Sequence, residues 1–482
     1  MPDSRPNILW ICSDQQRWDT LGCYGNPLVA SPTLDRLAET GVIFDRAFSQ
    51  SPVCTPSRTA FLTGRYPRTA RGNRNGADIP DYEVLVTRML ADAGYRCGLS
   101  GKLHLSACHP SACPEMERRI DDGYTDFHWS HHSMGGWGLN NEYWRWLDEH
   151  GSRYQTPEHP QCKYIMTGMP QELHQTTWCV EKAMDFIMAR HRDGQPWLFS
   201  VNMFDPHHPF DPPESFLNRY LERLDEIPLP NYVEEELANK PVYQKVDHEG
   251  AYANKGQFAY DEMTEKDHRM VRAAYWAMCD LIDTQVGRLL ALLEETGQSD
   301  NTVVIFTSDH GEMLGDHGIY LKGPHFYDCA IRIPLILSWK KKFPARHASA
   351  LVELVDLPQT LLDCVGLPKH PGMQGKSLYP LLCGETGADR HRDDIYCEYY
   401  QAMPGHQRPS ANLTMVRTAA HKLVVDHSHG GGELYDLAAD PNETRNLWDN
   451  SDLASVKSEL LLRMCHRMAD TVDPLPQRRA GF

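Results

Sequence analysis

Short apolar segments, each followed by polar or turn residues, recur along this chain. Three of them are almost wholly apolar, which is typical of parallel strands buried on both faces: 7–13, 196–204 and 302–308. Apolar residues recur on one face over 270–296, which predicts a long helix. Weaker patterns predict further strands at 96–100 and 333–339, and helices at 33–40 and 83–94. Helices that alternate with buried strands predict an α/β fold with a large, doubly wound, mostly parallel sheet.

The end of the chain has a different pattern. Segments 421–426 and 432–437 flank a glycine-rich turn and predict antiparallel strands, and 452–470 predicts a closing helix. We therefore expect a larger domain at 1–375 and a smaller C-terminal α+β domain with an antiparallel sheet at 376–482.

Residues 104–175 are rich in His, Trp, Tyr and Gly and have poor periodicity. We interpret this segment as an insertion in the larger domain. Two roles remain open at this point: shaping a substrate pocket, or packing on the core as an aromatic surface subdomain.

Composition narrows the class of protein. The chain has 482 residues, 41% hydrophobic and 23% charged, as in ordinary globular proteins. Its net charge of −17 argues against nucleic acid or an anionic membrane as a partner. No apolar run is long enough to span a membrane, and the sequence begins without a basic, apolar leader, so we expect a cytoplasmic protein. The 14 cysteines are scattered and are expected to be reduced thiols, although Cys108 and Cys113 could pair or bind metal.

Polar residues follow two of the predicted strands directly. Asp14 and Gln15 come after segment 7–13, and Asp309 and His310 come after 302–308. Ligands of open α/β sheets bind beyond the carboxyl ends of the strands. A lone Asp at a strand end is more often a turn or helix cap. Two such ends with a candidate nucleophile between them instead predict a divalent-metal site, with the Gln15 amide oxygen as a further ligand.

The candidate nucleophile is Cys54, in the sequence Cys-Thr-Pro-Ser-Arg. Pro56 suits the first turn of a helix, so Cys54 is expected at the positive end of a helix dipole, where an anionic ester is favoured. From the residues alone, a low-pKa or inert thiol is the favoured interpretation. Lys102 and His104 follow the strand at 96–100; a lysine there could simply be solvated, whereas histidine suits proton transfer near neutral pH.

The segment 54–58 resembles the C-x-P-x-R signature of type I, formylglycine-dependent sulfatases of the alkaline phosphatase superfamily. Further elements resemble that family in the same order: R-N-G at 74–76, G-K-x-H at 101–104, P-H-x-P-F at 206–210, and a lysine at 322. Segment 433–447 resembles the family's C-terminal hallmark. The resemblance runs from residue 7 to about 447 and implies the sulfatase fold, with 1–375 as the catalytic domain.

The resemblance also implies a mechanism. A formylglycine-generating enzyme converts Cys54 to formylglycine (3-oxoalanine), whose hydrate attacks the sulfur of a small anionic ester. His207 protonates the leaving alcohol with help from Lys322, and His104 removes the second hydroxyl proton, so that sulfate is expelled. His208 is the variable residue of its element, and Asn75 is either a substrate contact or a turn residue. The implied catalytic residues are Cys54, Arg58, Lys102, His104, His207 and Lys322, and the implied metal ligands are Asp14, Gln15, Cys54, Asp309 and His310.

Two positions depart from many arylsulfatases, which carry Asp and Asn where this chain has Gln15 and His310. The versions found here resemble phosphonate monoester hydrolases and some bacterial relatives. Imidazole suits Mn²⁺ better than Ca²⁺, so Ca²⁺, Mn²⁺ and Mg²⁺ all remain open. The expected function is hydrolysis of aryl or sugar sulfate monoesters, and the alternative is a phosphonate monoester or phosphodiester hydrolase.

Two other classes fit less well. A phosphomutase of the same superfamily uses Ser or Thr as nucleophile and lacks C-x-P-x-R. A non-catalytic binding protein would leave Cys54 unmodified. Relatives of this kind are often dimers or tetramers, so a homo-oligomer is also compatible with the sequence.

Overall fold

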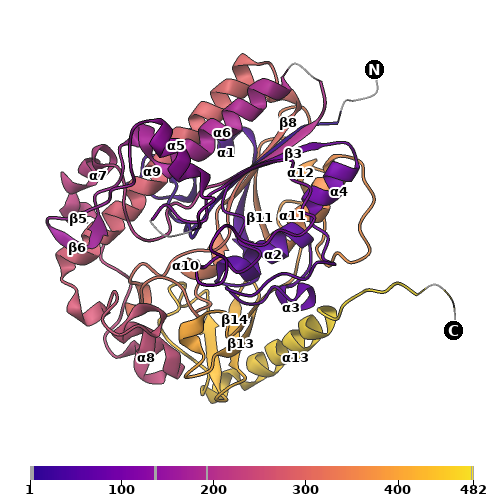
Figure 1. Cartoon of the computed structure of the whole chain (residues 1–482). Helices are drawn as coiled ribbons and strands as arrows, with labels where there is room; N and C mark the ends of the chain where they lie inside the picture. The colour runs from indigo at the N-terminus through magenta and orange to yellow at the C-terminus, as the bar shows by residue number, and fades with distance from the viewer. Residues whose placement is uncertain (1–4, 135–137, 192–193, 479, 481–482) are drawn as a thin grey trace.

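The computed structural model describes residues 5–134, 138–191, 194–478 and 480. One large sheet dominates it, with the strand order β11-β2-β10-β8-β1-β7-β3-β4 and β9 beside β2. Helices cover both faces of this sheet, and a smaller sheet lies below it (Figure 1). This arrangement confirms the predicted α/β architecture.

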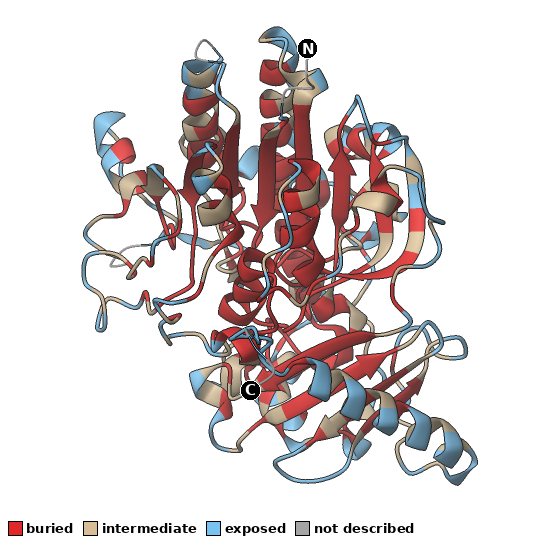
Figure 2. Ribbon diagram, turned by 90° about the vertical axis from the view of Figure 1, so that its right-hand side faces the viewer, coloured by how far each residue is buried: buried red, intermediate tan, exposed pale blue. Residues whose placement is uncertain are grey.

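The centre of the large sheet is parallel. β1 (Asn7–Ser13) pairs in parallel with β7 (Trp197–Asn202) and with β8 (Thr302–Ser308), and β7 pairs in parallel with β3 (Arg96–Gly101). β7 and β8 are buried at every residue, and β1 and β3 are buried at every residue except the first (Figure 2). Their continuous apolar sequences therefore reflect burial on both faces, as predicted.

Alternate residues of β1 serve two cores. Ile8 and Trp10 belong to one buried cluster, whereas Leu9 and Ile11 belong to another, because successive side chains point to opposite faces of a sheet. α1 (Pro32–Thr40), α6 (Gln175–Arg190) and α9 (Glu265–Glu295) pack together over the second cluster. α2 (Cys54–Thr63), α4 (Val86–Asp92) and α11 (Leu357–Cys364) pack over the first.

Several boundaries differ from the predictions. α9 begins at Glu265 rather than at 270, because Thr264 and Asp267 form a capping box that fixes its start. The strand predicted at 333–339 is divided into β9 (Arg332–Ile333) and β10 (Leu335–Ser338), and both pair antiparallel with β2 (Val42–Phe48).

Two strands on one side of the sheet were not predicted. They are β2 and β11 (Arg346–Glu353), which pair in parallel. Asp45 and Arg46 interrupt the apolar run of β2, and β11 begins with Arg346 and His347, so neither shows the continuous apolar pattern of a central strand.

Parts of the segment 104–175, interpreted from the sequence as an insertion, pair with the large sheet and pack against its helices. Its residues Asp126–Trp129 form β4, which pairs in parallel with β3 at the edge of the large sheet. In α5 (Glu142–Glu149), Tyr143 packs against Trp178 of α6, with ring centroids 5.9 Å apart. β5 (Glu158–His159) and β6 (Cys162–Met166) form a separate two-stranded sheet. Part of the segment therefore belongs to the core.

The smaller sheet is antiparallel throughout. Its order is β12 (Ile395–Tyr400), β13 (Asn412–Arg417), β14 (His421–Asp426) and β15 (Gly432–Asp436). The predicted hairpin and closing helix, α13 (Ala454–Asp470), are confirmed; β12 and β13 were not predicted. The division of the chain into domains at 376 stays a prediction.

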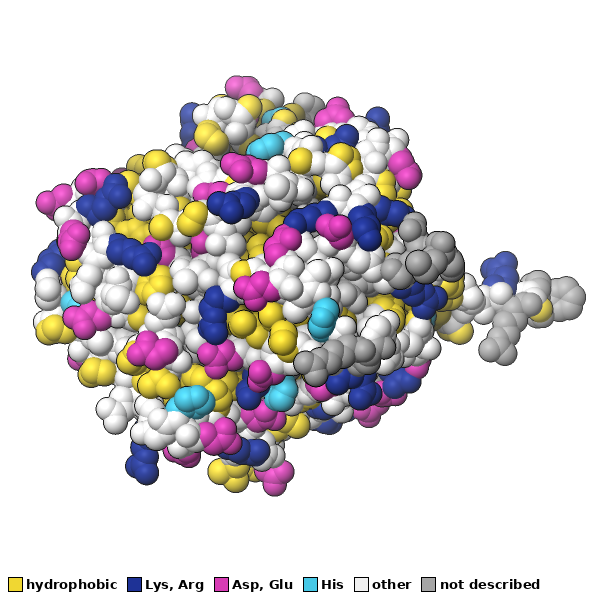
Figure 3. Space-filling view, turned by 90° about the horizontal axis from the view of Figure 1, so that it is seen from above, with side chains coloured by type: hydrophobic (Ala, Val, Ile, Leu, Met, Phe, Trp, Pro, Cys, Tyr) yellow, Lys and Arg dark blue, Asp and Glu magenta, His cyan; other side chains and the backbone are white. Residues whose placement is uncertain are grey.

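The surface is mixed in charge. On the face seen in Figure 3, lysine and arginine side chains intermingle with aspartate and glutamate. None of the helices in the described ranges has the length and apolarity needed to cross a membrane. All 14 cysteines lie among the described residues and are free, including Cys108 and Cys113, so those two form no disulfide.

Candidate active site

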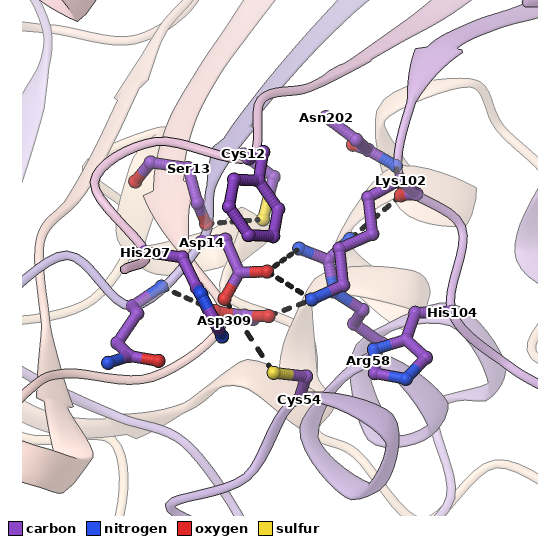
Figure 4. Close-up of polar contacts among 12 residues, drawn as sticks. Cys12, Ser13, Asp14, Cys54, Arg58, Lys102, His104, Asn202, His207 and Asp309 are labelled. Carbon is purple, nitrogen blue, oxygen red and sulfur yellow. Dashed lines mark hydrogen bonds and ion pairs between the residues drawn. The ribbon is translucent and has the colours of Figure 1, made fainter. Parts of the chain in front are cut away.

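The ends of β1 and β8 bring the predicted metal ligands together. Ser13 and Ser308 are partners in the sheet, so Asp14 and Asp309 leave it side by side. Potential ligand atoms of Asp14, Cys54, Asp309 and His310 all lie within 4.8 Å of one another, and all four residues are buried. Figure 4 shows Asp14 and Asp309 above the Cys54 sulfur. This confirms that the strand ends and the cysteine converge.

The His310 ring is oriented for a ligand. Its Nδ1 lies 2.8 Å from the Gly311 carbonyl oxygen, to which it donates as Nδ1–H. In the neutral ring Nε2 therefore carries the lone pair, and it lies 3.2 Å from Cys54 Sγ. A backbone acceptor behind the ring is the usual way to fix the tautomer of a metal-binding histidine. Two carboxylates and this imidazole fit a divalent cation that accepts a nitrogen ligand.

Gln15 is held by both ends of its amide. Its Oε1 accepts a hydrogen bond of 2.6 Å from Lys322 Nζ, and its Nε2 donates to Glu312. Its backbone nitrogen donates to Asp309 Oδ1 at 3.0 Å. The amide oxygen thus lies at the site, but its role as a metal ligand stays a prediction. Glu312 was missed in the sequence, where only its position three residues after Asp309 distinguishes it.

Cys54 is the first residue of α2, as expected. Every residue of this helix is buried, and its preceding residue, Val53, provides no side-chain cap. Cys54 Sγ accepts from Lys322 Nζ at 3.0 Å. Burial and Asp14 raise the pKa of the Cys54 thiol, but nearby cations outweigh them, and the pKa lies below its ordinary value. The position favours an anionic group.

Arg58 contacts the metal-ligand carboxylates. Its Nε donates to Asp309 Oδ2 at 2.8 Å, its Nη1 donates to the Lys102 carbonyl at 2.9 Å, and its Nη2 lies 3.8 Å from Asp14 Oδ2. Lys102 forms an ion pair with Asp14 as well. Burial raises the pKa of Asp14, but Lys102, Lys322 and Arg58 outweigh burial and hold the pKa well below its usual value. Arg58 therefore positions the carboxylates, whereas its buried Nη2 has no hydrogen-bond partner among the described residues.

His104 and His207 approach from opposite sides in the view of Figure 4. Burial, with Lys102 next in importance, holds the pKa of His104 well below its ordinary value. Burial and then Lys322 do the same for His207. Both rings are therefore neutral at neutral pH. His207 Nδ1 lies 2.6 Å from the His208 carbonyl and donates to it, so Nε2 is its free, basic nitrogen.

Asn75 contacts the start of α2. Its Oδ1 accepts from the backbone nitrogen of Thr55 at 3.0 Å, which satisfies one of the free N–H groups of the helix. The Asn75 backbone nitrogen donates to the Ala402 carbonyl at 2.9 Å. Asn75 is therefore a structural partner of the helix that carries Cys54, and a substrate contact stays a prediction.

Several neighbours of the site were not predicted. The rings of His207 and His208 stack with centroids 4.2 Å apart, and His132 lies 4.2 Å from the Phe204 ring. The ring of Tyr252 lies 5.6 Å from His208. The histidine-rich sequence around His132 was a signal; nothing in the sequence marked Tyr252, which the fold brings from a short 3-10 turn (Ala251–Ala253).

A cysteine at a helix start, beside a buried group of potential metal ligands at the carboxyl end of a parallel sheet, is the arrangement expected for the alkaline phosphatase superfamily. The family model described as Sulfatase matches residues 6–367, and the one described as N-sulphoglucosamine sulphohydrolase, C-terminal, matches 315–470. The chain belongs to the sulfatase family and is a sulfuric ester hydrolase.

Known sulfatases and a solved relative match most of the chain. An arylsulfatase of Clostridium perfringens is 28% identical and covers 93% of this chain and 91% of its own length. Mouse iduronate 2-sulfatase is 30% identical over 79% of this chain and 72% of its own. The solved phosphonate monoester hydrolase from Silicibacter pomeroyi superposes with a TM-score of 0.82 at 25% identity, over 97% of this chain and 96% of that one.

Proposed function

We propose that this sulfatase hydrolyses aryl or sugar sulfate monoesters at Cys54, after a formylglycine-generating enzyme has converted that residue to formylglycine. One divalent metal would be held by Asp14, Gln15, Asp309 and His310, with the oxygen of the modified residue 54 as a further ligand. The observation that carries the proposal is the position of Cys54 at the start of α2, within reach of the ligand atoms and 3.0 Å from the Lys322 ammonium.

Each absent group has a defined contribution. The metal, when bound, supplies positive charge that lowers the pKa of a hydroxyl and neutralises sulfate oxygens. Hydrated formylglycine supplies two hydroxyls on one carbon, one for attack on sulfur and one for expelling sulfate. The side chains of the protein bind the anion and move the protons.

Lys102 and Lys322 provide fixed positive charge at the reacting centre. Lys102 pairs with Asp14, and Lys322 contacts Cys54 and Gln15. Charges held in a buried site stabilise a developing anion without reorganisation during the reaction. They also attract a monoanionic ester to a protein of net charge −17, since local charge in a cleft decides this.

Two residues compete for protonation of the leaving oxygen. Lys322 Nζ donates to Cys54 Sγ and so lies next to residue 54. His207 is neutral in the free protein, and its Nε2 must gain a proton before it can give one. A bound sulfate ester brings negative charge that offsets Lys322 and favours that protonation. His104, also neutral, suits the opposite task of accepting the proton of the second hydroxyl.

A second function, phosphonate monoester or phosphodiester hydrolysis by the same residues, is favoured by one observation. His310 and Gln15 face Cys54 and Lys322 where many arylsulfatases carry Asn and Asp. The structural similarity to a phosphonate monoester hydrolase supports it too. Because the relatives similar to this chain in sequence include sulfatases, we propose sulfate esters as the main substrates.

The test is a comparison of kcat/KM on an aryl sulfate, an aryl phosphonate monoester and an aryl phosphodiester, with Ca²⁺, Mg²⁺ and Mn²⁺ in turn. Protein made with the converting enzyme should prefer the sulfate and lose activity in Cys54→Ala. Mass spectrometry of the peptide that contains residue 54 should show the aldehyde or its hydrate. A preference for the phosphonate or the diester would overturn the proposed substrate class. An intact thiol in active protein from the native host would overturn the proposed formylglycine chemistry.

We further propose a cytoplasmic location, a small anionic ester as the substrate, and neither nucleic acid nor membrane as a partner. The 14 free cysteines support the location, because such thiols are typical of reducing compartments. A homo-oligomer is part of the same proposal and is checked by light scattering of the purified protein.

A further inference from the structure

Next to the nucleophile lies a second group of metal-ligating side chains. A potential ligand atom from each of His104, Cys108 and His131 lies within 4.8 Å of the other two. Cys108 Sγ is 3.1 Å from His131 Nε2, and the ring centroids of His104 and His131 are 4.4 Å apart. All three residues are buried. The group contains none of the residues predicted to hold the first metal.

The three residues are held in place by the edge of the large sheet. His104 follows β3 and His131 follows β4, and Ser130 N donates to the Gly101 carbonyl at 3.0 Å, which joins the two strand ends. The buried Glu117 carboxylate accepts from the backbone nitrogens of His104 at 2.8 Å and Leu105 at 3.0 Å. This anchoring fixes the loop that carries His104 and Cys108.

One buried nitrogen in the group lacks a hydrogen-bond partner within the described part of the chain. His104 is 5% exposed, and its Nδ1 is buried without a hydrogen-bond partner among the described residues. A buried polar atom without a hydrogen-bond partner destabilises the folded protein. A cation bound to the group would give this imidazole nitrogen a partner.

The donor atoms select the kind of cation. Two imidazoles and a sulfur suit Zn²⁺ and similar borderline-soft cations, whereas Ca²⁺ and Mg²⁺ prefer oxygen. With usual Zn–N and Zn–S bond lengths, tetrahedral geometry places N and S about 3.6 Å apart. The observed 3.1 Å between Cys108 Sγ and His131 Nε2 needs only a small adjustment.

We propose that His104, Cys108 and His131 form a second metal site, for Zn²⁺ or a cation of similar chemistry, and that its occupation inhibits the enzyme. Binding forms one bond from the metal to sulfur and two to nitrogen, and it releases the Cys108 thiol proton to solvent, with no change of oxidation state. A solvent molecule completes the four ligands. Inhibition follows because a metal-bound His104 cannot accept a proton; this half of the proposal rests on the function proposed for His104, whereas binding does not.

Binding is tested with Co²⁺, whose absorption reports tetrahedral geometry and thiolate ligation. The full-length Cys54→Ala variant, which has no sulfur at the first site, is saturated with Mn²⁺ and titrated with Co²⁺. One equivalent should bind with a thiolate-to-cobalt band, and Zn²⁺ should displace it. The band should vanish in Cys54→Ala/Cys108→Ser and weaken in Cys54→Ala/His131→Gln. Cys54→Ala/Cys113→Ser is the matched control, because Cys113 is outside the group, and it should keep the band. Absence of the band, or its survival without Cys108, overturns the site.

Inhibition is tested separately on matured enzyme loaded with its own metal. Zn²⁺ should inhibit the protein with Cys108 intact, and Cys108→Ser should need at least tenfold more Zn²⁺ for half-inhibition, relative to its own rate without Zn²⁺. Equal inhibition of both proteins would mean that Zn²⁺ acts elsewhere and would overturn the inhibitory role. Co²⁺ binding without any Zn²⁺ inhibition would contradict the role of His104 in catalysis while the site itself stands.

Discussion

Lys322 places its ammonium nitrogen 3.0 Å from the sulfur of Cys54. The same nitrogen donates to Gln15 Oε1 at 2.6 Å, so one cation joins the nucleophile position to the metal-ligand set. This contact lies between residues 268 positions apart in the chain. In the proposed mechanism, Lys322 is therefore well placed to stabilise negative charge at residue 54 and to donate a proton to the leaving oxygen.

Replacing Lys322 by Met should therefore lower kcat/KM by about 10²-fold or more, the range for one positioned charge or proton donor. If Lys322 protonates the leaving oxygen, the loss should grow as the leaving alcohol becomes less acidic. The measurement is kcat/KM over a series of substituted aryl sulfates and one alkyl sulfate. Lys340→Met, at an exposed lysine paired with Glu294, is the matched control and should change nothing. A uniform loss across the series would assign the proton to another donor, with His207 next.

The metal preference should follow the Gln15 amide. Gln15→Asp adds a carboxylate to the shell, which favours Ca²⁺. That carboxylate would face Glu312, which now accepts from Gln15, so the change is paired with Glu312→Gln. In the double variant, the ratio of Ca²⁺ affinity to Mn²⁺ affinity should rise by about tenfold. Metal content after dialysis and activity restored by each metal give the measurement, with Glu312→Gln alone as the control. An unchanged ratio of the two affinities would exclude Gln15 as a ligand.

Asn75 allows its structural and substrate roles to be separated. Asn75→Asp keeps an oxygen acceptor for Thr55 N and puts negative charge at the start of α2, so stability should hold within about 1 kcal/mol. The same charge should repel an anionic ester, so KM should rise severalfold if Asn75 faces the substrate. Thermal unfolding and steady-state kinetics are measured on the same preparation. An unchanged KM would leave Asn75 as a partner of the helix alone.

Asp280 should make stability depend on pH. Burial raises its pKa to about 7, although the Ala30 N–H and the Tyr220 hydroxyl donate to it at 3.0 and 2.9 Å. Because the folded pKa exceeds the unfolded one, this group favours folding fully below about pH 4 and loses that contribution as pH rises through 7. Asp280→Asn stays neutral, so its Tm relative to the natural protein should rise by a few degrees between pH 5 and pH 8.

The control for this titration is Asp300→Asn, at an exposed aspartate. Its Tm difference from the natural protein should be the same at both pH values. A pH-independent difference for Asp280→Asn would show that the carboxyl is ionised in the folded state throughout this range.

The sequence predicted those parts of the fold that depend on local pattern. β1 and β8 are continuous apolar runs because both of their faces are buried, and their polar ends located Asp14 and Asp309. β4 was missed because Asp126 and His128 interrupt the apolar pattern of an edge strand. Edge strands bury less, so they leave a weaker signal.

The site divides in the same way. Residues in short sequence elements, such as Cys54 and Lys322, were named from the sequence, whereas Glu312 and Tyr252 were not. Tyr252 comes from a 3-10 turn without periodicity and meets His208 only through tertiary packing. The role of Arg58 also needed the structure, since only there do its bonds to Asp309 and to the Lys102 carbonyl become visible.

The burial of α2 has a consequence for the order of events in the life of the molecule. All ten residues from Cys54 to Thr63 are buried, so the converting enzyme proposed above would have to bind this stretch before the helix is covered. On this proposal each molecule would be committed while it folds: a chain that folded with an unconverted thiol would keep it, since opening this part of the core approaches the cost of global unfolding. The active fraction of a preparation would record how well conversion kept pace with folding.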